Sequence, residues 1–311
     1  MKFLMKKVAT AAMATGALLA MSAGSALAGP TFTINPSAIP TPFFAFTPFT
    51  AGFISGSSSE LLRQNPTNTG YFGSGYVQFG SFTGSSGVIS SLDSGLNSDY
   101  GLYLKFDIAV TYTGGGTGNG SLGSNYNVTQ LDFTVFADPG SPTIGRPNDT
   151  YTQANATTGT PATVFSPTSD DLLLAFGGLV PGATSVAVIN SAGGVGVNTV
   201  ESFAICSAPG FAKLGGTTIA APGCGSNIGT NYFQAPNPFY SIAFTEFNNV
   251  GPTGITRTGN PANPTTIGIA DASGGVTFAA VPEPGSMALL GIALAGLGLS
   301  RRNKNKAAKA A

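Results

Sequence analysis

Residues 102–113 read LYLKFDIAVTYT, and this stretch decides the fold class. Apolar or aromatic side chains occupy every second position from Leu102 to Tyr112, and Lys105 and Asp107 fall between them. Successive side chains of a β-strand point to opposite faces of a sheet. Twelve residues of alternation therefore predict an antiparallel strand with one buried face and one exposed face.

A second alternating stretch follows after a glycine-rich connection. Residues 126–137 again place apolar side chains on one face, including Leu131, Phe133 and Val135. Residues 114–123, which join the two stretches, are rich in glycine. Together they predict a long β-hairpin with a flexible connection.

The rest of residues 29–281 predicts further strands and no helix, because Pro, Gly and Asn interrupt the chain often and no helical periodicity is present. The shorter candidate strands are residues 31–34, 76–81, 185–189, 241–247 and 275–279. Residues 40–53, rich in Pro and Phe, predict an edge strand over the core, with an exposed adhesive patch as the alternative. Residues 143–168 predict a long surface loop. The whole predicts one antiparallel, β-sandwich-like domain.

The composition disfavours most enzymes. Only 8% of the 311 residues are charged, against roughly 25% in an ordinary domain, and there is no His and no Trp. The absence of His removes the usual general base and the commonest metal ligand. Between residues 29 and 300, five basic residues face all 13 acidic ones, a net charge of −8. Such an acidic body is unsuited to nucleic acid.

The N-terminus has the three parts of a secretory signal peptide over residues 1–28. Lys2, Lys6 and Lys7 are followed by an apolar stretch and then by Ala26-Leu27-Ala28, which predicts cleavage between Ala28 and Gly29 after passage through the Sec translocon. The alternative is an uncleaved anchor, for which the apolar stretch is short.

The C-terminus repeats these parts in reverse order over residues 282–311. Pro282, Glu283 and Pro284 precede the apolar residues 287–299, and a basic cluster follows from Arg301. Thirteen residues make a helix of about 20 Å, shorter than a hydrocarbon core of about 30 Å. This predicts a short transmembrane helix with its basic tail in the cytoplasm, where it holds the chain transiently in the inner membrane.

This C-terminal segment resembles the PEP-CTERM sorting signal of exopolysaccharide-producing Gram-negative bacteria. The residues that carry the resemblance are Val281-Pro282-Glu283-Pro284, the short Gly/Ala/Leu span and Arg301-Arg302. It implies an exosortase as processing partner, which cuts near Pro-Glu-Pro and sends the body outward. An ordinary tail anchor is the alternative.

The two cysteines, Cys206 and Cys224, lie in the body that is expected to be exported. In an oxidising compartment such a pair predicts a disulfide. Metal binding would need further soft ligands, and the chain has no His to supply them.

The body resembles the flocculation-associated branch of PEP-CTERM proteins. The resemblance implies a secreted protein that cells need to aggregate within their exopolysaccharide. Residues 143–168 and 183–200 depart from the family pattern. The stretches that carry the resemblance, besides the cysteine pair, are FTAGFISG at 49–56, SELL at 59–62, GLNSDYGLY at 95–103, DDLLL at 170–174 and PFY at 238–240.

The sequence contains few candidates for a catalytic or cofactor site. Residues 118–123 match G-x-G-x-x-G, but a strand-like pattern follows where a dinucleotide site needs a helix. No G-x-S-x-G is present. Asp170 and Asp171 are adjacent, so on a strand they point to opposite faces, and Asp93 with Asp99 is the other acidic pair. We expect no enzyme, no cofactor and no metal.

Two functions stay open from the sequence. The first is an exported matrix protein that associates with exopolysaccharide or neighbouring cells, in flocculation or biofilm. The alternative is a calcium-dependent lectin of the same matrix, since loop Asp residues suit Ca²⁺, although no EF-hand-like loop is present.

Overall fold

The computed structural model describes residues 30–40, 45–140, 147–167, 169–190, 193–248, 254–260 and 262–279. Residues Met1–Ala279 form one compact unit and Ala280–Ala311 a second, so all described residues belong to the first. The signal peptide with its Ala28–Gly29 bond, the motif Pro282-Glu283-Pro284 and the expected transmembrane residues 287–299 lie outside the described residues.

The predicted hairpin is present as two paired strands of 15 residues each. The strands β6 (Gly101–Gly115) and β7 (Ser124–Asp138) pair antiparallel along their length. Leu102, Leu104, Ile108 and Val110 are buried, as the alternation predicts. No helix follows the connection between the strands. Gly120 in that connection has φ +85°, and a Cβ there would lie 2.1 Å from the Tyr71 hydroxyl, so only glycine fits.

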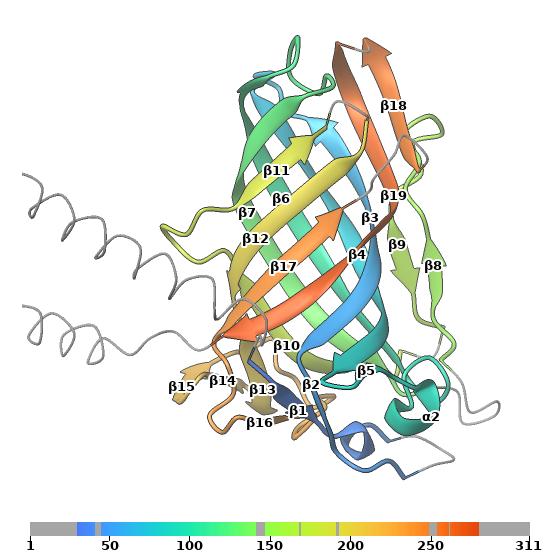
Figure 1. Ribbon diagram of the computed structural model, residues 1–311, viewed down its shortest axis with the longest axis vertical. Coiled ribbons are helices and arrows are strands. Elements are labelled where there is room, and N and C mark those ends of the chain that lie inside the picture. Colours follow the sequence, from blue (N-terminus) through green and yellow to red (C-terminus); the bar gives the residue numbers. More distant parts are fainter. Residues whose placement is uncertain are drawn as a thin grey trace, which may run out of the picture. The chain divides into compact units, whose positions relative to one another are not determined.

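Eight antiparallel strands form a closed ring (Figure 1). The order around the ring is β7-β11-β12-β17-β19-β3-β4-β6 and back to β7. Ring strands not yet bounded are β3 (Phe53–Gln64), β4 (Gly70–Gly84), β11 (Val186–Ile189), β12 (Val195–Ser202), β17 (Ile242–Asn248) and β19 (Asn263–Ala279).

The ring closes because β7 has different partners along its length. Its first residues pair with β11, while its later residues pair with β10 (Leu172–Gly178). From β10 a branch runs outward through β13 (Ala204–Ala208), β14 (Phe211–Leu214) and β15 (Thr217–Ala220). The predicted antiparallel all-β fold is confirmed, and its opposing layers are walls of one continuous sheet.

Smaller elements cover the ends and outside of the ring. The three-stranded sheet β16-β1-β2 lies below the ring in Figure 1. A hairpin of β8 and β9 lies beside β3 and β4, β18 extends β19, and β5 extends β4. The bounds are β1 (Phe32–Ile34), β2 (Phe49–Ala51), β5 (Gly87–Ile89), β8 (Thr150–Thr152), β9 (Thr163–Phe165), β16 (Phe233–Ala235), β18 (Ile255–Asn260), the helix α2 (Ser91–Ser94) and the 3₁₀ turn η1 (Pro36–Ala38).

Two expectations about irregular segments need correction. The stretch 143–168 was predicted to be a loop, but its described part contains the hairpin β8–β9, and Ala154, Ala156 and Ala162 are buried there. In the described part of the stretch 40–53, Phe49–Ala51 forms a strand that pairs with β1 at the edge of the small sheet, and Phe53 begins β3. Within the described part of the chain, no helix is long and apolar enough to cross a membrane.

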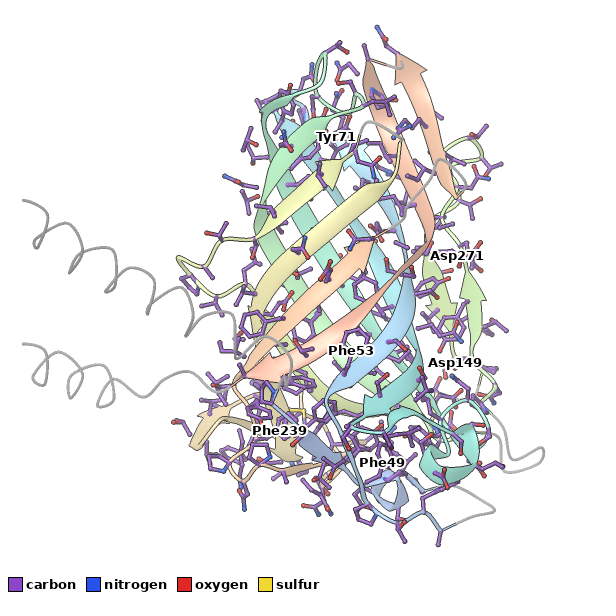
Figure 2. All side chains as sticks on the ribbon, viewed as in Figure 1. Phe49, Phe53, Tyr71, Asp149, Phe239 and Asp271 are labelled. Carbon is purple, nitrogen blue, oxygen red and sulfur yellow. A yellow bond between two sulfur atoms is a disulfide. The ribbon has the colours of Figure 1, made fainter. Side chains whose placement is uncertain are left out.

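Phenylalanine and tyrosine dominate the lower end of the core. Phe203 and Phe278 meet edge to face with ring centroids 4.8 Å apart, and Phe203 and Phe233 do so at 5.3 Å. Phe239, labelled in Figure 2, packs 5.3 Å from Phe278. Offset and edge-to-face contacts of this kind are the favoured geometry of aromatic pairs. This cluster seals the ring against the sheet β16-β1-β2.

Candidate functional site

A large groove lies on the outer face of the sheet. Its volume is about 1200 Å³, and its floor consists of outward-facing residues of β4, β6, β7 and β10. One wall is β9 with its preceding residues, and the other is the loop 220–227 after β15. Two inserted segments therefore turn an open sheet surface into a groove.

Two carboxylates face each other on the floor of this groove. Asp107 of β6 and Asp132 of β7 are direct cross-strand partners, and both are exposed. Ser74 of β4 pairs with Asp107, so a row of polar side chains crosses the three strands β4, β6 and β7. Gln130 Nε2 donates to Asp132 Oδ2 at 2.8 Å. Like charges directly opposite each other destabilise a sheet, so this pair indicates a role other than stability.

Lys105 lies on the same floor beside an aromatic pair. Its Nζ atom is 5.5 Å from the ring centroids of both Tyr103 and Phe136, and these two rings stack 5.3 Å apart. A cation over an aromatic face is held by the ring quadrupole. The floor thus combines one positioned cation, two carboxylates and aromatic surface.

The disulfide fixes the loop wall. Cys206 of β13 is bonded to Cys224, as predicted, and the loop residues on either side of Cys224 line the groove. Asn227 Nδ2 donates to the carbonyl of Asp171 at 2.5 Å, and the Leu173 amide donates to the Asn227 carbonyl at 3.1 Å. These contacts attach the loop to the start of β10.

The hairpin wall is held by burial and by hydrogen bonds to the ring. Tyr151 of β8 packs against Tyr76 and Tyr103 with ring centroids 5.3 and 6.1 Å apart. The Ala154 amide donates to Ser59 Oγ at 2.9 Å. Gln153 Nε2 donates to Asp271 Oδ1 at 2.6 Å. The hairpin therefore covers the outer face of β3, β4 and β6.

Three carboxylates gather at the end of the groove near α2. One oxygen each of Asp138, Asp149 and Asp171 lies within 4.8 Å of the others, and Asp149 is labelled in Figure 2. Asp138 is fully buried and accepts hydrogen bonds from the amides of Gly140 and Asp149, at 3.0 and 3.1 Å. Tyr103 donates its hydroxyl proton to Asp171 Oδ2 at 2.7 Å. Asp171 also lines the groove, so the cluster and the groove are continuous.

Several oxygen atoms in this cluster are buried without a hydrogen-bond partner. They are both carboxylate oxygens of Asp149, Oδ1 of Asp171 and Oγ of Ser166. Burial, and then repulsion from Asp171 and Asp138, raises the pKa of Asp149 to about 7, against a smaller lowering by the charge of Lys105. Burial also raises the pKa of Asp171. Hard cations such as Ca²⁺ take oxygen ligands of this kind.

The structure separates the acidic residues that the sequence places together. Asp171 joins the three-carboxylate cluster, but its neighbour Asp170 does not. Asp93 accepts a hydrogen bond from Ser90 at the start of α2, and Asp99 accepts one from Ser98. Asp93 and Asp99 therefore make hydrogen bonds within local turns. The sequence assigns Asp107 and Lys105 to an exposed strand face and predicts the hairpin with residues 126–137, but it does not give the register that sets Asp107 opposite Asp132.

The comparisons with known proteins concern the C-terminal segment. Residues 280–302 match the family model of the PEP-CTERM protein-sorting motif. The chain carries a PEP-CTERM protein-sorting motif. The match covers Pro282, Glu283 and Pro284 and the apolar span after them. No curated protein and no solved structure matches this PEP-CTERM protein. The motif supports a bacterial protein that is exported with a membrane-anchored sorting signal and processed by exosortase.

Proposed function

We propose that this chain is a non-enzymatic matrix protein at the surface of a Gram-negative bacterium. Its β-body binds exopolysaccharide or neighbouring cells and so promotes flocculation or biofilm formation. The sorting motif at residues 280–302 supports export, and the resemblance of the body to flocculation-associated proteins supports the aggregation role. The body is the part that acts outside the cell.

The observation that carries this proposal is the facing pair Asp107 and Asp132 on the groove floor. Exposed carboxylates accept hydrogen bonds from hydroxyl groups, and Lys105 donates them. The nearby ring of Phe136 gives an apolar surface for the face of a sugar. An open groove with these groups suits a segment within a polysaccharide chain.

Affinity at one groove is expected to be modest, because the groove is open and polar contacts there compete with water. A polymer presents the same repeat many times, and many copies of the protein bind along it. Linking weak sites in this way raises the overall affinity by orders of magnitude. Many weak contacts of this kind would therefore be enough to join cells through the polymer. A deep binding pocket in each copy of the protein is not needed.

The test is cosedimentation of the full-length protein with polymer from the producing strain, together with clumping of cells that carry each variant. We expect Asp107→Asn/Asp132→Asn to lower polymer binding at least fivefold and to reduce clumping, while Glu246→Gln, exposed on β17 away from the groove, leaves both unchanged. Unchanged binding in the groove variant would refute the proposal.

The non-enzymatic part of the proposal has its own test. The chain has no His, and the three-carboxylate cluster is one candidate for hydrolysis among the described residues. We expect no release of reducing sugar when purified protein is incubated with the producing strain's polymer. Release that disappears in Asp171→Asn would identify a hydrolase instead.

A calcium-dependent lectin is the second candidate function. The supporting observation is the cluster of Asp138, Asp149 and Asp171 at the groove, with buried oxygens that lack partners. A calcium ion held there would leave Asp171 in contact with a bound sugar. Chelator should then abolish polymer binding, calcium should restore it, and Asp149→Asn should remove the calcium response. Binding that is indifferent to chelator favours the matrix protein without calcium.

A further inference from the structure

The closed sheet has a hollow interior. A cavity of about 70 Å³ lies inside the ring, with walls from β3, β4, β6, β7, β12, β17 and β19. A second interior cavity of about 30 Å³ shares Glu60, Ile108 and Val197 with the first. Eight closed strands enclose a space that side chains can fill or that can hold one small ligand. Here the side chains leave part of it open.

Two buried carboxyl groups interrupt the apolar wall of the larger cavity. Glu201 of β12 is 1% exposed, and Glu60 of β3 is 5% exposed. The Thr245 hydroxyl donates to Glu201 Oε1, but Glu201 Oε2 has no partner. Ser58 Oγ donates to Glu60 Oε2 at 3.3 Å. A buried oxygen without a donor costs free energy, so the wall offers an acceptor that a ligand can satisfy.

The interior has no matching positive charge. Among the described residues, no Lys or Arg belongs to the wall of either cavity. Burial raises the pKa of both Glu60 and Glu201 to about 7, which places proton exchange near neutral pH. A buried carboxylate needs a counter-charge and hydrogen-bond donors. The complementary ligand therefore brings a positive charge of its own.

The volume limits the size of that ligand. A cavity of about 150 Å³ holds benzene, and a water molecule takes about 30 Å³ of liquid volume. A space of about 70 Å³ is too small for a sugar, an acyl chain or an aromatic ring. It has room for an aliphatic chain of about three or four carbons.

We propose that the interior of the ring binds a small primary alkylamine. Its ammonium group donates to Glu201 Oε2, and its alkyl chain lies against the apolar wall formed in part by Val197, Ala243 and Val276. This site differs from the outer groove: Phe106 and Phe133 line both, but the acidic pair Asp107 and Asp132 lines the groove alone.

The test uses n-propylamine and n-propanol, which have the same number of heavy atoms and differ in charge. Each is titrated into the full-length protein in amphipol at pH 8, and binding is followed by calorimetry and by the rise in Tm. We expect saturable binding of n-propylamine with a Kd at least tenfold lower than that of n-propanol. Equal binding of the two probes, or no binding of the amine, would overturn the proposal.

Substitutions in the cavity wall test whether n-propylamine binds inside the ring. Glu201→Gln should weaken n-propylamine at least tenfold, and Ala243→Leu, which fills the cavity, should abolish binding. Glu246→Gln is the matched control, because Glu246 is an exposed glutamate on β17. If Ala243→Leu does not fold, Glu201→Gln still decides the question. Full binding in Glu201→Gln, or an amine-soaked crystal with only water in the cavity, contradicts the proposal.

Discussion

Asp107 of β6 and Asp132 of β7 lie directly opposite each other on the outer face of the sheet. Both are exposed, and they form the centre of a groove floor that also contains Lys105. Two negative charges in register are an unfavourable choice for a sheet. In the proposed function a ligand uses both carboxylates, and this proposal leads to the first prediction.

Substitution of Asp107 in the facing pair should have opposite effects on the stability of the fold and on polymer binding. Asp107→Asn removes the repulsion between facing carboxylates, so the free energy of unfolding should rise by about 0.2–1 kcal/mol. Polymer binding should fall in the same variant, because an amide is a weaker acceptor than a carboxylate. Denaturant titration and cosedimentation measure the two effects. A variant that is both less stable and fully active would disprove the interpretation of this pair.

Loss of the disulfide should weaken the fold and the groove together. Cys206 and Cys224 are separated by 18 residues and are both buried. In the chain-entropy model, closing a loop of this size contributes about 3 kcal/mol. Cys206→Ala/Cys224→Ala should therefore lower the denaturation midpoint and reduce polymer binding, since Cys224 lies within the groove wall. A reductant should destabilise the wild-type protein and leave the double variant unaffected.

The buried Glu201 should make stability depend on pH. Burial raises its pKa from the ordinary 4.5 to about 7, against a smaller lowering by the hydrogen bond from Thr245. Between these two values the folded state holds more protons than the unfolded state. The free energy of unfolding should therefore fall as pH rises from about 4.5 to about 7 and stay low above that.

Glu201→Gln tests this dependence, because glutamine cannot ionise. A shift of this size corresponds to a penalty on the order of 3 kcal/mol at pH 8. The variant should be more stable than wild type at pH 8, by about 1–3 kcal/mol, and similar to it at pH 4. Glu60 and Asp149 also have raised pKa values, so the difference between the two profiles is the quantity to measure. Parallel profiles would show that Glu201 does not titrate in this range.

Processing should remove both terminal signals. We expect mass spectrometry of the exported protein to find Gly29 at the N-terminus and no peptide from beyond the Pro-Glu-Pro region. Pro282→Ala/Glu283→Ala/Pro284→Ala should keep the protein in the membrane fraction, because exosortase acts on the motif in residues 280–302. Intact residues 301–311 recovered outside the cell would contradict this order of events.

The alternation at residues 102–113 and 126–137 was enough to predict two central strands and their buried faces. A period of two leaves one arrangement of side chains for a half-buried strand. A strand rich in Ser and Gly was not predicted from the sequence. Phe53–Gln64 has no clear alternation, since its outer face is covered by the hairpin β8–β9 and is buried as well. The local sequence pattern does not reveal that a distant segment of the chain covers the outer face of this strand.

The sequence by itself determined the all-β class, the C-terminal sorting motif and the disulfide, because these depend on local period, local composition and a lone cysteine pair. Beyond the predicted hairpin of residues 102–113 and 126–137, only the tertiary structure decided which strands are neighbours. Closure of the ring through β7 and β11 put Glu60 and Glu201 in one interior, although they are far apart in the chain. Pairing of β6 with β7 set Asp107 against Asp132. Register across strands depends on all the contacts of the core at once, so no single stretch of sequence contains it.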